Sequence, residues 1–314
     1  MIQLLRSTTA YKGMCADAAA NSCAHATLVV FPDESYLRPL LKECAKAFFG
    51  AADGSRESRL IEEESFSDCL FFPAAGEKLT AELGARILEE SALKPVEAEK
   101  KLFVLDAFHT VTPLVQNKLL KVLEEPPAGV YFLLGASNEY SVLPTVRSRM
   151  KTIVQPPFSE ERIEAALMRM HPGENGISEA AAACGGVYSA AEALLVGGGE
   201  DFRLAEQFVS GENTERLCRE IGEKKEKQQA FFSALRLVLR DMLLIATGQG
   251  QYAARKGKEL VRLAGQYPAG AIASFLALVN RAEREAKFNA NLAQCVLSLA
   301  ISMTEEKARW QTLS

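Results

Sequence analysis

The stretch KLFVLDAFHTVTPLVQNKLLKVLEEPPAGVYFLLGAS, residues 101–137, decides the fold. It opens with the apolar run KLFVLD (101–106) and closes with a second one, VYFLLGAS (130–137). Between these runs, Thr112 suits the position before a helix, and apolar residues recur every four positions over Pro113–Leu123. Two apolar strands joined by a helix predict a strand–helix–strand unit with parallel strands.

The residues around this unit repeat the alternation of apolar strands and helices. Three more apolar runs are ATLVVF (26–31), DCLFF (68–72) and KTIV (151–154). Helical patterns lie between the runs, most clearly over Ser35–Phe49 and Ala81–Ser91. Continuous apolar strands separated by helices predict a parallel sheet that is covered by helices on both faces.

After Pro157 the strand signal ends, and amphipathic helical patterns follow one another. The clearest are Glu160–Met170, Ser178–Cys184, Ala190–Val196, Gln228–Thr247 and Ala269–Lys287. One apolar helical face carries Leu235, Val238, Leu239, Leu243 and Leu244, and we expect most of it to pack internally. The sequence therefore predicts an α/β domain over residues 1–157, a small helical domain over 158–200 and a second helical domain over 201–314.

Composition excludes several classes of protein. Hydrophobic residues make up 48% of the 314 residues and charged residues 24%, a balance that excludes disordered and collagen-like chains. A net charge of −4 excludes a surface that is basic throughout, so any DNA contact is local or shared with partners. The charge-free windows are too polar for a membrane span, and the N-terminus has no apolar export signal, so we expect a cytoplasmic protein.

The cysteine pattern argues against disulfide and metal chemistry. The seven cysteines are odd in number, widely spaced and free of any CxxC pair. We interpret most of them as small buried residues.

Four motifs in fixed order carry a family resemblance. They are a strand ending in Asp106, the helix end LLKVLEEPP (119–127), a strand leading to Asn138, and VLPTVRSR (142–149). In this order and spacing they resemble the delta-prime family of bacterial DNA polymerase III clamp-loader subunits, which belongs to the AAA+ group. The likeness continues more loosely over the whole chain. The last motif departs from the family pattern at its first position, where Val142 replaces Leu.

This resemblance implies a fold and a role. The implied fold is a RecA-like AAA+ parallel sheet domain, a small three-helix lid and a C-terminal helical collar that serves oligomerisation. The implied role is a non-hydrolysing stator in a ring with gamma/tau-type motor subunits and a delta subunit. Primed DNA and the sliding clamp would be reached through the complex. The chain would not be an enzyme in isolation and would belong to the DNA polymerase III holoenzyme, with no cofactor of its own.

The phosphate-binding loop of active relatives is degraded in this chain. Such a loop needs glycines, a lysine and a hydroxyl residue to close around phosphates. Alignment from either side places Phe31 to Arg38 there: Phe31 stands at the first glycine, Tyr36 and Leu37 at the Gly-Lys pair, and Arg38 at the hydroxyl. Bulky side chains would block the phosphate, and the carboxylates of Asp33 and Glu34 would repel it.

The acidic motif at the end of the first strand of the unit is also degraded. Active relatives place there a glutamate that positions the attacking water, whereas this chain has Ala107 after Asp106. We interpret Asp106 as a strand-end cap. His109 is interpreted as a turn residue, because no Cys or His lies at a metal-ligand offset from it.

Arg149 is the one catalytic element that is retained. With Ser148 it forms the tripeptide that, in this family, faces the nucleotide of the neighbouring subunit. The resemblance therefore implies an arginine finger acting in trans, and such fingers raise rates by about 10³- to 10⁵-fold. Met150 replaces the usual cysteine. Two interpretations of Arg147 stay open: it contacts a partner or a DNA phosphate, or it is a solvated residue.

A zinc module common among these relatives is not expected here. Tetrahedral structural zinc needs four ligands, and Gly50–Phe71 supplies only Cys69, with Cys44 preceding it. We therefore predict no metal. The acidic run Glu62–Glu64 is interpreted as a solvated face or a helix start.

Two other functions stay open at the level of sequence. The chain could be a diverged AAA+ ATPase that binds nucleotide itself, with Lys42 or Arg38 on the phosphates. It could also be an inactive AAA+ scaffold recruited to another assembly. Nucleotide binding to the isolated chain separates the first alternative from the stator, and copurification with a gamma or delta subunit separates the second.

Overall fold

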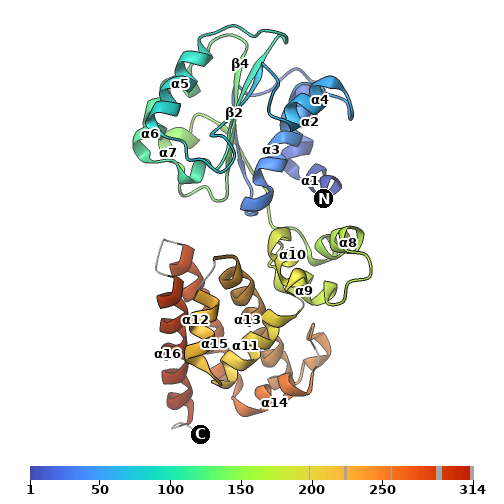
Figure 1. Ribbon diagram of the computed structural model, residues 1–314, viewed down its shortest axis with the longest axis vertical. Coiled ribbons are helices and arrows are strands. Elements are labelled where there is room, and N and C mark those ends of the chain that lie inside the picture. The colour runs from blue at the N-terminus through green and yellow to red at the C-terminus, as the bar shows by residue number, and fades with distance from the viewer. Residues whose placement is uncertain (198, 223–224, 256, 288–291, 312–314) are drawn as a thin grey trace. The chain divides into compact units, whose positions relative to one another are not determined.

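The computed structural model describes residues 1–197, 199–222, 225–255, 257–287 and 292–311. The chain divides into two compact units, Met1–Pro157 and Phe158–Ser314. The first unit contains the sheet and the second, within the described residues, is helical (Figure 1). The finer division into lid and collar at residue 200 stays a prediction.

Five parallel strands form the sheet of the first unit, in the order β2-β3-β4-β1-β5. Their bounds are β1 Ala26–Val30, β2 Cys69–Phe72, β3 Lys101–Leu105, β4 Val130–Ala136 and β5 Lys151–Val154. All four neighbouring pairs are parallel, so a helical segment crosses from one strand to the next, and β1 lies between β4 and β5 although it comes first in the sequence. The predicted fold class, a parallel sheet domain followed by helices, is confirmed.

Apolar side chains on the sheet explain why these segments are strands. Every residue of β1 and β3 is buried, as expected for a sheet covered on both faces. Three rings stack across neighbouring strands: Phe72 to Phe103 at 6.3 Å between centroids, and Phe103 to Phe132 at 5.2 Å. These rings join β2, β3 and β4 into one core.

Helices cover the two faces of the sheet. Their bounds are α1 Ile2–Arg6, α2 Thr9–Ala19, α3 Glu34–Phe48, α4 Arg56–Glu62, α5 Ala81–Ser91, α6 Pro113–Glu124 and α7 Pro144–Arg147, with the 3₁₀ helix η1 at Phe108–Thr110. Figure 1 shows α5, α6 and α7 on one side of the sheet and α1 to α4 on the other. Thr112 occupies the predicted N-cap of α6, but its side chain makes no capping hydrogen bond.

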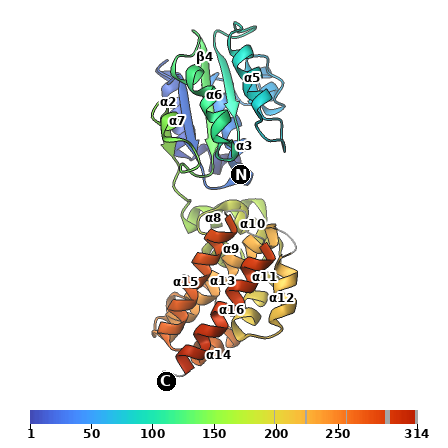
Figure 2. The same cartoon turned by 90° about the vertical axis from the view of Figure 1, so that its left-hand side faces the viewer.

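The second unit packs its helices around α13. The bounds are α8 Glu160–Met170, α9 Ile177–Ala183, α10 Tyr188–Val196, α11 Glu200–Ser210, α12 Thr214–Gly222, α13 Lys225–Ala246, η2 Gly250–Tyr252, α14 Lys258–Gln266, α15 Ala269–Lys287 and α16 Leu292–Gln311. Helix α16 runs beside α15 (Figure 2). Leu235, Val238 and Leu239 of α13 are fully buried, which confirms that this face packs internally. No helix in the described part of the chain is long and apolar enough to span a bilayer.

Candidate functional site

The carboxyl edge of the sheet is the candidate site. The strands are parallel, so the segments that follow β1, β2, β3 and β4 all leave the sheet at this edge. In open α/β sheets, ligands bind outside the carboxyl ends of the strands. Here the edge receives Phe31 after β1, Pro73 after β2, Asp106 after β3 and Ser137 after β4.

The segment after β1 is too short and too buried to enclose a phosphate. Only Phe31, Pro32 and Asp33 separate β1 from α3. The Phe31 side chain is buried, and its N–H donates to the Ala136 carbonyl at 2.9 Å. A phosphate loop instead needs backbone N–H groups that point at the ligand.

The other predicted loop residues lie inside α3. Tyr36, Leu37 and Arg38 occupy its first two turns, and Leu37 is 1% exposed in the core. At the beginning of this helix, Asp33 is the N-cap residue and is also 1% exposed. Helix N-termini favour anions, and here the protein's own carboxylate already lies at that end.

Arg38 joins two carboxylates at this edge. Its Nη2 and Nε lie 2.5 and 2.7 Å from the two oxygens of Glu64, a bidentate pair. Its Nη1 donates to Asp106 Oδ2 at 3.2 Å and to the Pro73 carbonyl at 3.1 Å. The Glu64 oxygen Oε1 also lies 3.2 Å from Nζ of Lys42. We call these four side chains, Arg38, Lys42, Glu64 and Asp106, the Arg38 cluster.

Arg38 and Glu64 each stabilise the ionised form of the other. Hydrogen bonding from Arg38 holds the pKa of Glu64 below its usual range, and the bond to Glu64 raises the pKa of Arg38. The side chains of Arg38, Glu64 and Asp106 are only 15%, 22% and 16% exposed. Arg38 and Lys42, the two cations that could replace the missing phosphate lysine, are therefore already engaged by carboxylates.

The interpretation of Glu62–Glu64 as a solvated face holds for Glu62 and Glu63, which are exposed, but Glu64 is only 22% exposed, and the run ends a helix instead of starting one. These residues lie at the end of α4 and just beyond it. Glu64 pairs with Arg38, and Glu62 Oε2 lies 2.6 Å from Nζ of Lys46 on α3. Three cations of α3 attract these carboxylates, an interaction that sequence spacing could not reveal.

The two oxygens of Asp106 both have protein donors. Oδ2 accepts from Arg38, and Oδ1 accepts from the N–H of Ala107 at 2.7 Å. Ala107 adopts a left-handed conformation, with φ 48° and ψ 36°, where the chain turns into η1. The Asp106 carboxylate is thus bound by a guanidinium and a backbone amide.

A second polar group lies where β4 ends. His109 Nδ1 accepts from the N–H of Ser137 at 3.2 Å, and its Nε2 lies 3.4 Å from Glu34 Oε1. Ser137 also donates its hydroxyl to Glu34 at 2.9 Å. Asn138 caps a turn, because its Oδ1 accepts from both the N–H and the hydroxyl of Ser141 at 3.0 Å.

Gln116 anchors the segment that leads to Arg149. Its side chain on α6 is 1% exposed and donates to the carbonyls of Val111 and Ser141, both at 2.9 Å. It also accepts from the N–H of Leu143 at 2.8 Å. The next helix, α7, is fixed by the fully buried Val146. Sequence reasoning missed Gln116, although a polar side chain at a buried helix position was a usable signal.

Arg149 lies just after α7, with its side chain 33% exposed. Its Nη1 donates to the Thr145 carbonyl at 2.7 Å, within the same turn. Its Nη2 donates to Glu124 Oε1 at 3.3 Å, and its Nε lies 3.0 Å from Glu124 Oε2. The predicted finger is therefore a partly exposed cation that is held by its own chain.

The residues next to Arg149 have local partners. The Ser148 hydroxyl donates to the Thr145 carbonyl at 3.1 Å, and Arg147 pairs with Glu139 at 3.0 Å. Met150, in the position of the usual cysteine, packs against the core of the sheet unit.

The cysteines of the sheet unit offer no grouped ligands. Cys44 and Cys69 are buried, and burial raises the pKa of both thiols. Within the described ranges, no three Cys, His, Asp or Glu side chains are grouped so that they could hold a metal ion.

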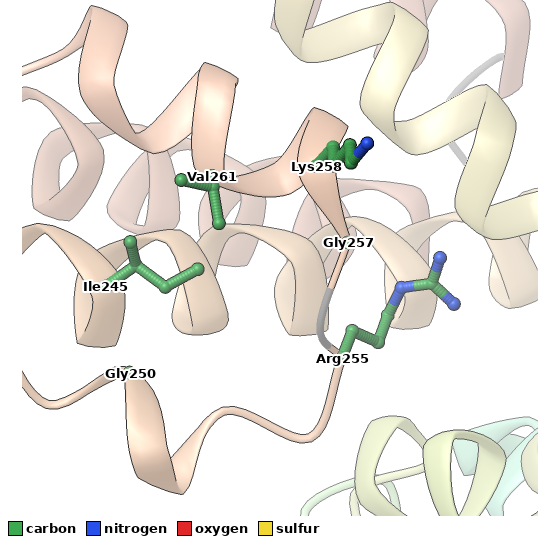
Figure 3. Close-up of a pocket in the computed structure, with 6 residues that line it drawn as sticks. All are labelled: Ile245, Gly250, Arg255, Gly257, Lys258 and Val261. Carbon is green, nitrogen blue, oxygen red and sulfur yellow. The ribbon is translucent and has the colours of Figure 1, made fainter.

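A cavity of about 480 Å³ lies in the helical unit. None of the predicted site residues lines it. Its lining residues are Ile245, Gly250, Arg255, Gly257, Lys258 and Val261 (Figure 3). Arg255 is itself engaged, since its Nη2 lies 3.3 Å from Glu206 and its guanidinium lies 4.2 Å from the Phe202 ring.

Comparison with known proteins identifies relatives of the sheet unit. Residues 7–159 match the family model described as "DNA polymerase III, delta subunit". A DNA polymerase III subunit tau/gamma of Haemophilus influenzae is 30% identical over 117 residues, or 37% of this chain and 17% of that protein. A subunit gamma/tau of Mycobacterium tuberculosis is 42% identical over 55 residues, which are 18% of this chain and 10% of that protein.

Two solved structures align along most of the chain. One is a DNA polymerase III gamma subunit-related protein of Thermotoga maritima, 18% identical, with a TM-score of 0.47 and coverage of 95% of this chain and 99% of that one. The other is the Bacillus subtilis DNA clamp loader delta protein, 12% identical, with a TM-score of 0.35 and the same coverages. The curated sequence relatives are matched over a small part of their own length. The family model and the sequence relatives confirm the predicted resemblance to DNA polymerase III subunits.

Proposed function

Because residues 7–159 match the DNA polymerase III delta-subunit family, we propose that this chain is a clamp-loader subunit of the delta-prime kind. It binds no nucleotide itself and supplies Arg149 to the ATP site of a neighbouring subunit. One observation carries the proposal: the carboxyl edge of the sheet is filled by the chain's own charges, while Arg149 is partly exposed beside the C-terminal end of α6.

The filled edge supports a non-hydrolysing role. Hydrolysis needs a phosphate cradle, a metal-binding carboxylate and a residue that positions water. In this chain the first strand runs almost directly into α3, Arg38 binds Asp106, and Ala107 stands at the place of the water-positioning residue. Each of the three requirements is thus opposed by a specific residue.

The geometry of Arg149 supports a role in trans. A guanidinium is always charged and can bind a phosphoryl group through two parallel N–H donors. Introduced across an interface, it stabilises the charge that develops on the transferred phosphoryl group. Arg149 satisfies the requirement for a fixed base, because Gln116 and Val146 hold the segment that carries it.

The partners follow from this assignment. The motor subunits would be of the gamma/tau type, and the chain would also contact a delta subunit. The sliding clamp and primed DNA would be reached through the complex, which belongs to the DNA polymerase III holoenzyme. The helices of residues 158–200 would form the lid, and those of residues 201–314 would hold the chain in the ring.

The test is the ATP turnover of a reconstituted loader that carries Arg149→Ala. We expect a loss of about 10³-fold or more at the site that faces this chain. Arg59→Ala is the matched control, because it removes an exposed arginine of the same unit that lies outside the motif. Turnover that is unchanged at every site with Arg149→Ala would exclude the finger.

Binding measurements address the two other functions. Calorimetry of the isolated chain with ATP and Mg²⁺ should show no binding, since Arg38 and Lys42 are already paired with Glu64. Saturable binding that is lost in Arg38→Met would instead support an ATPase with a substitute loop. Failure of the chain to copurify with gamma and delta subunits would favour a scaffold of another assembly.

A further inference from the structure

The contacts of Arg149 within its own chain bear on how the finger is controlled. Glu124 is the last residue of α6, and its two oxygens face Nε and Nη2 of Arg149 at 3.0 and 3.3 Å. Bidentate recognition of a phosphate commonly uses this same edge of a guanidinium. The carboxylate therefore occupies an edge that a phosphate from the neighbouring subunit would also use.

The pair is exposed enough to be exchanged. The side chains of Glu124 and Arg149 are 52% and 33% exposed, and ion pairs in such settings contribute little net stability. A triphosphate carries several negative charges and makes stronger charge-assisted hydrogen bonds than one solvated carboxylate. The triphosphate and the Glu124 carboxylate also repel each other, so one edge of the guanidinium binds only one of them at a time.

The second contact of Arg149 differs from the first. The Thr145 carbonyl, 2.7 Å from Nη1, carries no net charge and lies within the same turn as Arg149. It can stay bonded while a phosphate approaches the other nitrogens. Thr145 thus orients the guanidinium, whereas Glu124 neutralises it.

We infer that Glu124 is a placeholder for the neighbour's phosphate: it holds the Arg149 guanidinium while the adjacent ATP site is empty and is displaced when ATP enters. This inference rests on the proposed finger role of Arg149. Glu124 is consequently a positioning residue that competes with ATP for the finger. The competition raises the ATP concentration at which the neighbouring site fills.

The test is the ATP dependence of turnover in the reconstituted loader that carries Glu124→Gln. Glutamine has nearly the same shape but no charge, so it removes the electrostatic competition while the Thr145 carbonyl still orients Arg149. We expect half-maximal turnover at an ATP concentration about two- to fivefold lower, the range that corresponds to an exposed ion pair. The shift should be smaller at high salt, because exposed charges are screened.

Matched variants isolate the pair. Glu125→Gln removes the same charge one residue further on and should leave the ATP dependence unchanged. Glu124→Gln in an Arg149→Ala background should also have no effect, because its target is gone. An equal shift from Glu125→Gln, or a shift that persists without Arg149, would overturn the inference.

The outcome also separates this inference from the proposed function. If Arg149→Ala lowers turnover but Glu124→Gln leaves the ATP dependence unchanged or raises the ATP requirement, the finger stands and the placeholder is excluded. If Arg149→Ala has no effect on turnover, the finger itself is excluded, and the placeholder with it. Thermal melting of each isolated variant verifies that the altered chains are folded.

Discussion

Replacing Arg38 by methionine tests whether the Arg38 cluster holds the carboxyl edge of the sheet together. Methionine keeps an apolar stem of similar length and removes the guanidinium. Glu64 and Asp106 then lose a common cation while their side chains remain only 22% and 16% exposed. The Pro73 carbonyl loses a hydrogen-bond donor as well.

The loss of folding stability expected for Arg38→Met lies between two limits. Exposed ion pairs contribute about 0–1 kcal/mol, whereas breaking a buried pair costs about 3–5 kcal/mol. Arg38 is 15% exposed and has two carboxylate partners, one of them bidentate. We therefore expect Arg38→Met to lower the free energy of unfolding of the sheet unit by about 2–3 kcal/mol at pH 7.

The cost should depend on pH with a definite sign. Arg38 holds the pKa of Glu64 below its usual range, so the pair stabilises the fold above the unfolded pKa of about 4.3. That stability is lost as pH falls through the lower folded-state pKa. The difference between wild type and Arg38→Met should accordingly shrink on the acid side of pH 4.

Urea unfolding followed by peptide-level hydrogen exchange assigns the change to one unit. Trp310, the only tryptophan, lies on α16, so its fluorescence reports the helical unit and should not change. Arg59→Met, which alters an exposed arginine on α4, is the matched control. A cost below about 1 kcal/mol at pH 7, or one that is the same at acid pH, would refute the reasoning.

Two further substitutions test the packing and the backbone around this edge. Gly135→Ala should lower the free energy of unfolding of the sheet unit by about 1–3 kcal/mol, because the new Cβ would lie 2.6 Å from Leu41 Cδ1. Urea unfolding measures the change, and an unchanged unfolding midpoint would mean that α3 can shift freely. Ala107→Gly should raise the melting temperature slightly, since φ of 48° costs a non-glycine residue about 1 kcal/mol; a lower melting temperature would contradict a strained turn.

The strands were predictable from the sequence because each is a short, continuous apolar run. The predicted limits of β3 and β4 differ from the observed ones by a single residue, and β5 agrees fully. Helices α2 and α4 were not predicted. Few of their side chains are buried, Ala10 and Met14 in α2 and Ser58 and Ile61 in α4, so they lack a strong apolar period.

The candidate site was predictable only in part. The motif residues Asp106 and Arg149 were found from sequence, because fixed spacing identifies them. The contacts around Asp106 were not found. Arg38, which binds both Glu64 and Asp106, lies 26 residues from the first and 68 from the second. No local periodicity links residues so far apart, and only the sheet topology brings α3, α4 and β3 to one edge.

The closed edge and the finger are connected through one helix. Asp106 leads through η1 into α6, and α6 carries both Gln116, which anchors the segment before α7, and Glu124, which contacts Arg149. In an ATPase, nucleotide entry at the edge can move such a helix. Here Arg38 donates to Asp106 at 3.2 Å, so the chain's own guanidinium takes the place that a ligand would occupy at this edge. Under the proposed finger role, we expect the segment that carries Arg149 to stay fixed while the neighbouring site turns over, and only the Arg149 side chain to exchange partners. Weakening the Arg38 cluster should therefore reduce turnover at the neighbouring site, although Arg38 contacts no nucleotide.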